Sequence, residues 1–247
     1  MPASAFHFRQ ASDIVTQIRT VRHFLQREDE TSSAIASCIK WIDHTEQGYT
    51  ELVLATRDRP LLLEKICCAL ASEQINILSA DLFTRTDSIV VNIFRVCTTN
   101  FEALTSTATR KRILETFETI LAATQYEPER YLRRRANFLK DRTDQDIPVP
   151  VLAFLSNELH PACTTLEIQA LDRIGLLHDL FHTINHYGLN TAHARICTDK
   201  GVAMDTLYIT TAQGGKVDDP HILQLLEQRV STLIAKPETQ ESGIPTS

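Results

Sequence analysis

Three histidines recur at intervals of four residues, at His178, His182 and His186. On a helix, side chains at this spacing lie along one face, and two imidazoles at positions i and i+4 can bind one metal ion. By the 3.6-residue period, this row points away from the apolar stripe of its own helix. We therefore predict that the row faces solvent, and we predict no metal ligand and no catalytic residue in this chain.

Two related turns carry residues better suited to binding a small zwitterion. Residues 58–63 read Asp-Arg-Pro-Leu-Leu-Leu and residues 172–177 read Asp-Arg-Ile-Gly-Leu-Leu, each ahead of an apolar stripe with helical spacing. The start of a helix offers unpaired N–H groups and a positive dipole end to a carboxylate. Asp172 can accept from an ammonium group, and Asn190 offers both a donor and an acceptor. Each also has a simpler role, Asp172 as a helix N-cap worth about 1 kcal/mol and Asn190 as a tie at a strand start.

Gly175 distinguishes the second turn from the first. A glycine within a helix costs roughly 0.5–1 kcal/mol relative to alanine, so its presence indicates close approach of another backbone or a ligand. Leu61 holds the equivalent position in the first turn and would fill that space. We predict that the second turn provides the main ligand contacts, while the first provides packing or a weaker site. The predicted ligand-binding residues are Asp172, Arg173, Ile174, Gly175, Leu176, Leu177 and Asn190, together with Asp58, Arg59, Pro60, Leu62 and Asn76.

The two turns belong to an internal repeat with an offset of 114 residues, which also places Asn76 on Asn190 and Ala80 on Ala194. In each copy, two strands lead into the turn, a helix follows, and then come a hairpin and a second helix. The predicted strands are Ser37–Asp43, Thr50–Thr56, Ile75–Thr84 and Ile89–Thr98, then Val151–Asn157, Thr164–Ala170, Leu189–Thr198 and Val202–Thr210. The helical stripes are Leu62–Leu70, Ile113–Leu121, Leu176–Ile184 and Ile222–Leu233.

This order of elements predicts an α+β fold with two ferredoxin-like ββαββα repeats. Each repeat is expected to form a four-stranded antiparallel sheet with two helices on one face, and the sister repeat is expected to cover the other face. The predicted division is an N-terminal helical segment at 1–33, repeats at 34–124 and 147–236, a charged linker at 125–146 and a disordered tail at 237–247. The N-terminal helix, with Ile14, Ile18, Val21, Phe24 and Leu25 on one side, has no evident partner in either repeat.

Composition narrows the possible partners and the compartment. The net charge of the 247 residues is −6, which offers no overall attraction to nucleic acid or to anionic lipid. The basic cluster Arg133–Arg135 is diluted by acidic neighbours and fits a solvated linker. No apolar run approaches the roughly 20 residues of a membrane helix, and no secretory signal is visible, so we predict a cytoplasmic location without a membrane partner. The six cysteines are expected to be reduced, with Cys67 and Cys97 buried.

The β-α-β unit, with Asp-x-x-Gly-Leu-Leu at residues 172–177 and Asn190 near the next strand, resembles the ACT domain, a family of amino-acid sensors attached to metabolic enzymes. More narrowly, residues 11–233 resemble the C-terminal tandem ACT region of the enzymes that uridylylate and deuridylylate the PII nitrogen-signal protein. The segments that carry this resemblance are Leu166–Leu177, Gly188–Asn190, Ala203–Tyr208, Val149–Val151 and the helix from Ala11 to Glu28.

The resemblance implies a regulatory region that binds an amino acid, glutamine in that family, and reaches PII through its parent enzyme. The nucleotidyltransferase and phosphohydrolase domains that use Mg or Mn would lie upstream, so no cofactor is expected in this chain. No Gly-Ser followed by paired aspartates occurs here. Pairing of two chains through the ACT sheets is also implied.

Two alternatives remain open from the sequence. The first is a stand-alone tandem-ACT regulator that acts through a protein partner. The N-terminal helix argues against this alternative, because it is similar to the end of a preceding domain. The second is a small enzyme that uses the histidine row or the pair Cys67-Cys68.

Overall fold

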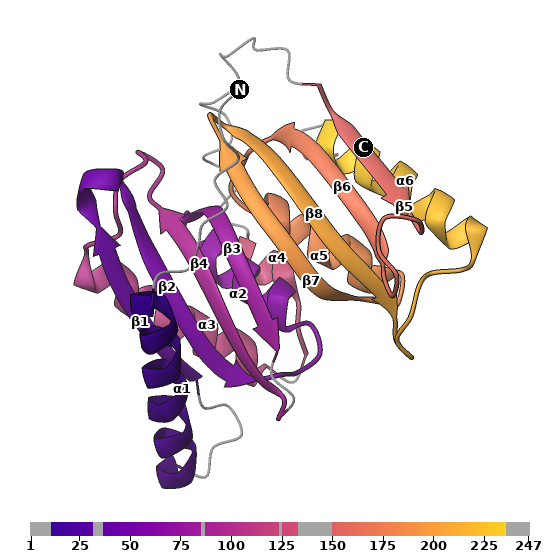
Figure 1. Ribbon diagram of the computed structural model, residues 1–247. Coiled ribbons are helices and arrows are strands. Elements are labelled where there is room, and N and C mark those ends of the chain that lie inside the picture. The colour runs from indigo at the N-terminus through magenta and orange to yellow at the C-terminus, as the bar shows by residue number, and fades with distance from the viewer. Residues whose placement is uncertain (1–10, 32–36, 85–86, 124, 133–149, 236–247) are drawn as a thin grey trace, which may run out of the picture.

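The computed structural model describes residues 11–31, 37–84, 87–123, 125–132 and 150–235 (Figure 1). The predicted linker cluster Arg133–Arg135 and the predicted tail 237–247 lie outside these residues. The N-terminal part and the first repeat contain α1 (Ala11–Thr31), β1 (Ser37–His44), the short 3-10 helix η1 (Thr45–Gln47), β2 (Tyr49–Arg57), α2 (Leu62–Ser72), β3 (Asn76–Thr84), β4 (Ile89–Cys97), α3 (Thr107–Ala122) and α4 (Pro128–Leu132). The second repeat contains β5 (Leu152–Ser156), β6 (Thr164–Leu171), α5 (Leu176–His186), β7 (Leu189–Asp199), β8 (Val202–Thr211) and α6 (Pro220–Ala235).

All eight strands form one antiparallel sheet in the order β1-β2-β4-β3-β7-β8-β6-β5. The order in each half follows the same ββαββα scheme, so the predicted α+β class and both four-stranded antiparallel repeats are confirmed. The predicted strands and helices occur within a few residues of their expected bounds. Local hydrophobic periodicity was sufficient for this, since each strand buries one face and each helix one stripe.

The two repeats join edge to edge rather than face to face. Strands β3 and β7 pair through Ser79 with Cys197, Ala80 with Ile196 and Asp81 with Arg195. The expectation that the sister repeat covers the open face of the sheet is therefore wrong. An edge strand presents unpaired N–H and C=O groups, and pairing two edges satisfies them without stacking the sheets.

The helices that close the core lie on one face of this continuous sheet. In Figure 1, α2, α3, α5 and α6 lie behind the strands, while α1 crosses in front of β1 and β2. One hydrophobic cluster runs through both repeats on the helix side, from Leu52 and Phe94 in the first to Leu166 and Ile184 in the second. Helices α2 and α5 contact each other across the β3–β7 junction.

Helix α1 has a partner within the chain, contrary to expectation. Its Val21 and Phe24 are buried against Val53, Ala55 and Val91 on the front face of the first repeat. Ile18, from the same predicted stripe, is 62% exposed. Only part of the apolar side of α1 therefore meets the sheet. Among the described residues, no helix is long and apolar enough to span a bilayer.

The residues before α2 and α5 share an unusual backbone conformation. Gly175 is not inside a helix; it is the N-cap of α5, in the left-handed region with φ 78° and ψ 6°. Leu61 occupies the equivalent place before α2 with φ 61° and ψ 19°. Glycine adopts this region freely, whereas an L-residue with a Cβ pays roughly 1–2 kcal/mol. The positive φ explains Gly175 without a ligand, and the first repeat tolerates the strain at Leu61.

The strain predicts opposite stability effects at the two positions. Leu61→Gly relieves the left-handed strain and loses little packing because Leu61 is 38% exposed. Glycine also increases the conformational entropy of the unfolded chain, which offsets part of this gain. We therefore expect the free energy of unfolding to rise by about 0.5–1 kcal/mol. The matched variant Gly175→Leu should lose about 1 kcal/mol or more. Urea denaturation measures both free energies of unfolding, and stabilisation by Gly175→Leu would contradict the assignment.

Candidate functional site

Each predicted ligand-binding turn faces the strand start of the other repeat. Asn76, at the beginning of β3, donates from Nδ2 to Asp172 Oδ2 over 2.9 Å. Asn190, at the beginning of β7, lines a space together with Asp58 and Pro60. We expected Asn190 to lie beside Asp172 in its own repeat. Instead, the edge-to-edge junction places Asn76 beside Asp172 and Asn190 beside the turn that contains Asp58. Two composite sites result, each built from both repeats.

The two composite sites are related by the internal repeat. The Asp58 N–H donates to Ser88 O and the Asp172 N–H donates to Gly201 O, both over 2.8 Å, which fixes the two turns in the same way. Asn92 is the fourth residue of β4, and Asp205 is the fourth residue of β8. Each lines the site beside the turn of its own repeat. The repeat therefore places an amide in one site where it places a carboxyl in the other.

The site at the second turn is nearly filled. Its cavity measures about 10 Å³ and is lined by Asp172, Arg173, Gly175, Asn76 and Asp205, among others. Asn76 is 4% exposed and Asp205 is 2% exposed. Arg173 Nη1 lies 2.6 Å from Asp179 Oδ2, so its charge is paired within the first turn of α5. This small volume offers little space for the main ligand contacts that the sequence analysis places at this turn. We call this space the closed cavity.

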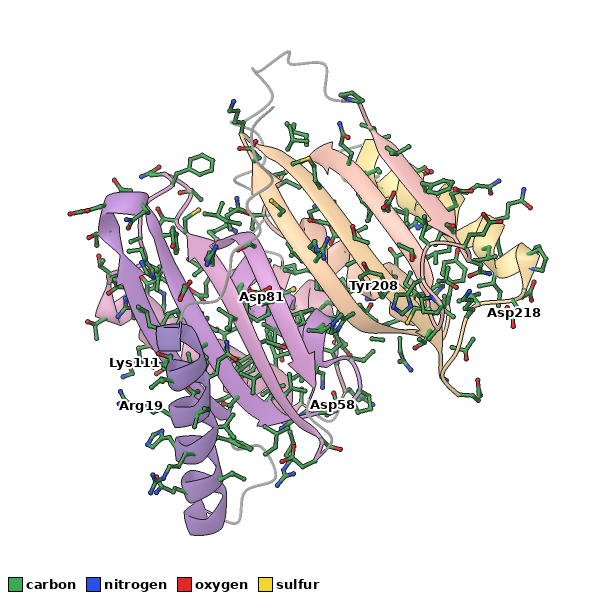
Figure 2. All side chains as sticks on the ribbon, viewed as in Figure 1. Arg19, Asp58, Asp81, Lys111, Tyr208 and Asp218 are labelled. Atoms are coloured by element: carbon green, nitrogen blue, oxygen red, sulfur yellow. The ribbon has the colours of Figure 1, made fainter. Side chains whose placement is uncertain are left out.

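The site at the first turn is open. A groove of about 670 Å³ is bordered by the turn, by Leu82, Ser88, Val90 and Asn92, and by the other repeat. From the second repeat come Phe181 and Asn185 on α5 and residues 190–192 on β7. Figure 2 labels Asp58 at the end of the first repeat that is turned toward the second repeat. We call this space the open groove, and its volume suits a small metabolite.

Asn92 is the unusual residue of the open groove. It is 0% exposed and shares its strand face with the core residues Val90 and Phe94. Neither its Nδ2 nor its Oδ1 has a hydrogen-bond partner among the described residues. An unsatisfied buried amide costs about 1–3 kcal/mol, so Asn92 is a candidate hydrogen-bond partner for a polar ligand in the groove. Asn92 is not among the residues predicted from the sequence, although a polar residue on the buried face of an apolar strand is a signal of such a site.

The predicted turn residues divide into exposed and structural groups. Asp58 and Pro60 are exposed at the rim of the open groove, while Leu62 is buried beneath it. Arg59 donates from Nη2 to Thr56 Oγ1 over 3.1 Å, and burial, partly opposed by the charge of Asp58, lowers its pKa. In the second repeat, Ile174 is half-buried and Leu176 and Leu177 are buried.

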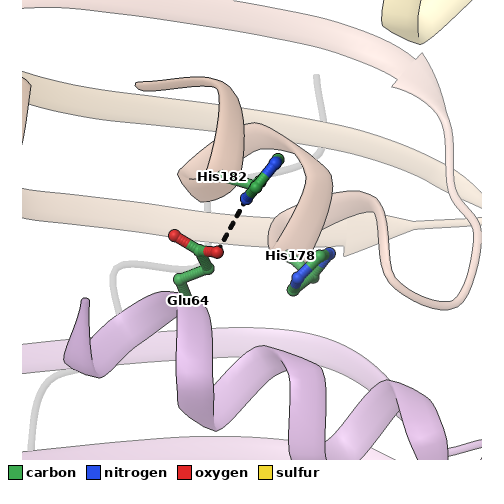
Figure 3. A group of neighbouring side chains, drawn as sticks. All are labelled: Glu64, His178 and His182. Carbon is green, nitrogen blue, oxygen red and sulfur yellow. Dashed lines mark hydrogen bonds and ion pairs between the residues drawn. The ribbon is translucent and has the colours of Figure 1, made fainter. Parts of the chain in front are cut away.

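The prediction that the histidine row faces solvent holds for His182 and His186 but not for His178. His178 is 3% exposed, and its ring stacks on His182 with centroids 5.8 Å apart. His182 Nδ1 lies 2.8 Å from Oε1 of Glu64, a residue of α2 that is 2% exposed (Figure 3). Helix α2 covers this side of α5 because both helices lie on the same face of the joined sheet. His182 and His186 are both exposed, so within the row only His178 is buried.

The contacts of Glu64 decide its charge. Burial pushes the pKa of Glu64 upward, but hydrogen bonds from His182 and Asn185 outweigh burial and hold the pKa below its usual value. The hydrogen bond to Glu64 raises the pKa of His182, although partial burial opposes this. Asn185 Nδ2 donates to Glu64 Oε2 over 2.6 Å. A carboxylate of the first repeat is thus tied to two side chains of the second.

The pair Cys67-Cys68 does not have the properties of a nucleophile. Both thiols are buried, and burial raises the pKa of Cys68 to about 11 and the pKa of Cys67 still further. None of the six cysteines, all within the described residues, forms a disulfide, and Cys197 is the exposed one. A thiol at such a pKa stays protonated at neutral pH, so it is a poor nucleophile and a poor metal ligand.

Comparison with known proteins defines the class of the second repeat. Residues 153–239 match the family model described as ACR9-like, ACT-like domain. The second repeat is an ACT-like domain, in agreement with its ββαββα order. A solved structure, the aspartate kinase from Synechocystis, is similar with a TM-score of 0.39 and 14% identity, covering 74% of this chain and 27% of that chain. Nothing about function follows from that similarity.

Among curated proteins, the chain is similar to bifunctional uridylyltransferase/uridylyl-removing enzymes. The enzyme of Rhodopseudomonas palustris is 27% identical over 225 residues, which are 90% of this chain and 24% of that protein. The enzyme of Rhodospirillum rubrum is 27% identical over 205 residues, 83% of this chain and 21% of that protein. The resemblance to the ACT region of these enzymes is confirmed. The chain spans about a quarter of the length of these relatives, which is consistent with a regulatory region.

The closed cavity predicts a pH-dependent stability. Burial, with a further contribution from the charge of Asp172, raises the pKa of Asp205 from 3.8 to about 7, against the hydrogen bond from the Cys197 N–H. Because the folded state binds this proton more tightly than the unfolded state, stability falls as the pH rises from about 4 to about 7. Asp205→Asn removes the buried charge and keeps an oxygen that can accept from Cys197. At a pH of about 8 we expect it to be more stable than the parent by roughly 2–4 kcal/mol.

Urea denaturation across this pH range measures the effect. The two proteins should differ least near the lowest pH of the series. Parallel stability profiles for the parent and Asp205→Asn would show that Asp205 does not titrate in this window.

Proposed function

We propose that this chain is an amino-acid-sensing regulatory module and that its ligand, glutamine, binds in the open groove. The observation that carries the proposal is the unpartnered, fully buried Asn92 at the wall of a groove of about 670 Å³. The ACT-like second repeat and the similarity to uridylyltransferase/uridylyl-removing enzymes support a regulatory role.

The groove offers complementary groups to each part of an amino acid. The N-terminus of α2 presents backbone N–H groups and a positive dipole end, which favour the α-carboxylate. Asp58, exposed at the rim, accepts from the α-ammonium group. Asn190, from the other repeat, adds a donor and an acceptor. The contacts come from both repeats, so the ligand bridges the β3–β7 junction.

The chemistry of Asn92 favours glutamine among the amino acids. A primary amide in the ligand side chain can donate to Asn92 Oδ1 and accept from Asn92 Nδ2 at the same time. A carboxylate would leave Oδ1 without a donor, and an apolar side chain would leave both atoms unpaired. Sites built on buried hydrogen bonds reject analogues that lack the partner group more strongly than apolar pockets reject size changes.

Regulation requires that the ligand prefer one arrangement of the repeats. A ligand that contacts both sides of the junction binds more tightly when the two repeats are held together at that junction. A difference of about 1–3 kcal/mol in binding free energy between the two arrangements is sufficient for a useful switch. In the proposed setting, cytoplasmic catalytic domains outside this chain uridylylate and deuridylylate PII, and the glutamine-bound module shifts the balance between these activities.

Isothermal titration calorimetry of glutamine against the full chain tests the site. Asn92→Leu should weaken glutamine binding by about 10- to 100-fold, because it removes a pair of buried hydrogen bonds worth about 1–3 kcal/mol. The variant should fold at least as stably as the parent, since it also removes an unsatisfied amide. The matched control is Asp205→Asn, the equivalent position in the closed cavity, which should leave glutamine affinity unchanged.

A thermal-shift screen of the twenty amino acids tests the ligand class independently. A ligand that binds only the folded state must raise the melting temperature. Glutamine should give the largest shift. Absence of a shift with every amino acid would overturn the sensor proposal, and loss of binding in Asp205→Asn with retention in Asn92→Leu would move the site to the closed cavity.

A further inference from the structure

A second polar cluster lies between the repeats, on the helix side of the junction and formed by different residues from the open groove. Glu64 projects from α2, and His178 and His182 project from successive turns of α5 (Figure 3). One ligand atom from each of these three residues can be chosen so that all three lie within 4.8 Å of one another. We call these residues the Glu-His-His cluster.

The donor set is typical of a site for Zn²⁺ or a similar transition-metal ion. Zinc takes imidazole nitrogen at about 2.0–2.1 Å and carboxylate oxygen at about 2.0–2.2 Å, and two histidines with one glutamate leave a fourth position for water. Two histidines at i and i+4 on one helix face present their rings to the same point. Ligand atoms on a tetrahedron of this size lie about 3.4 Å apart. The side chains therefore have to draw together only slightly around an ion.

The surrounding contacts orient the ligands. His178 Nδ1 lies 3.0 Å from Asp179 Oδ1, a carboxylate–histidine contact that orients the ring. His178 Nε2 lies 3.4 Å from the Tyr126 hydroxyl, a long contact that a bound ion would replace. Asn185 Nδ2 donates to Glu64 Oε2 over 2.6 Å and fixes the carboxylate. Metal-binding histidines and carboxylates commonly have such outer partners, which set the tautomer and the ring orientation.

Burial and charge favour an ion over an empty cluster. Glu64 and His178 are almost fully buried, whereas the His182 side chain is 48% exposed and gives a path from solvent. Asp179 and Glu129 lie close enough to act on His182 electrostatically, although the charge of Asp179 is also paired with Arg173. The proton shared by His182 Nδ1 and Glu64 Oε1 occupies the place that a metal ion would take.

We propose that Glu64, His178 and His182 form a binding site for one divalent transition-metal ion, Zn²⁺ by its donor set, that clamps the first repeat to the second. Two ligands come from α5 and one from α2, so the ion bridges the repeats independently of the sheet hydrogen bonds. The proposal does not depend on the proposed amino-acid ligand, which occupies the open groove.

Metal titration of the full chain tests the site. The protein carries Cys197→Ser to remove the exposed thiol, its purification tag is cleaved, and bound metal is stripped with a chelator that is then dialysed away. Calorimetry at neutral pH should show one equivalent of Zn²⁺ bound, and Co²⁺ in the same site should give the visible absorption of a tetrahedral ion. Zn²⁺ should also raise the melting temperature.

Substitutions assign the binding to the cluster. His182→Gln and Glu64→Gln should each weaken Zn²⁺ binding by at least about 100-fold, more than the loss of an outer partner usually causes. The matched control is His186→Gln, the next histidine of the same row, which is exposed and should leave Zn²⁺ affinity unchanged. Circular dichroism confirms folding; His182 is half-exposed, so its variant remains informative even where Glu64→Gln fails to fold.

The outcomes separate clearly. Stoichiometric binding that is lost in His182→Gln and retained in His186→Gln supports the clamp. Absence of binding to the parent, equal affinity in the parent and His182→Gln, or equal loss in His186→Gln would overturn it. A change in Zn²⁺ binding in Asn92→Leu is not expected, because that residue lies in the open groove.

Discussion

The pairing of β3 with β7 is the interaction on which the rest of the structure depends. Three residue pairs, from Ser79 to Asp81 and from Arg195 to Cys197, join two four-stranded sheets into one. Because the junction is edge to edge, the turn before each repeat's first helix lies beside the start of a strand in the other repeat, at Asn76 or Asn190. The same geometry places α2 against α5. Both composite sites and the Glu-His-His cluster therefore exist only while the junction is formed.

The repeat is nearly symmetric in backbone and clearly asymmetric in chemistry. The hydrogen bonds that fix the two turns are equivalent, but Asn92 stands in one site where Asp205 stands in the other. In the second-turn site, Asn76 bonds to Asp172 and the cavity closes to about 10 Å³. In the first-turn site, Asn190 stays exposed and a groove of about 670 Å³ remains. Divergence of a few polar residues thus separates a structural site from a candidate binding site.

The junction is also where a regulatory signal would act. A ligand in the open groove contacts both repeats, and the Glu64–His182 pair connects them through α2 and α5. A change in either contact alters the free energy of the same arrangement, which is the condition for coupling between sites. The strained Leu61 lies at the rim of the groove. The first repeat thus has a left-handed leucine at the position where the second repeat has glycine.

The sequence by itself determined the elements, their order, the duplication and the α+β class, because hydrophobic periods of 2 and 3.6 residues and the Asp-Arg turns are local properties of the chain. It also identified the turns that line both sites. Only the tertiary structure decided which partners meet: that Asn190 belongs with the Asp58 turn, that His178 is covered by α2, and that the first turn holds the open space. Those outcomes depend on which edges of the two sheets pair. The pairing of these edges depends on contacts between residues more than a hundred positions apart, so no local sequence pattern predicts it.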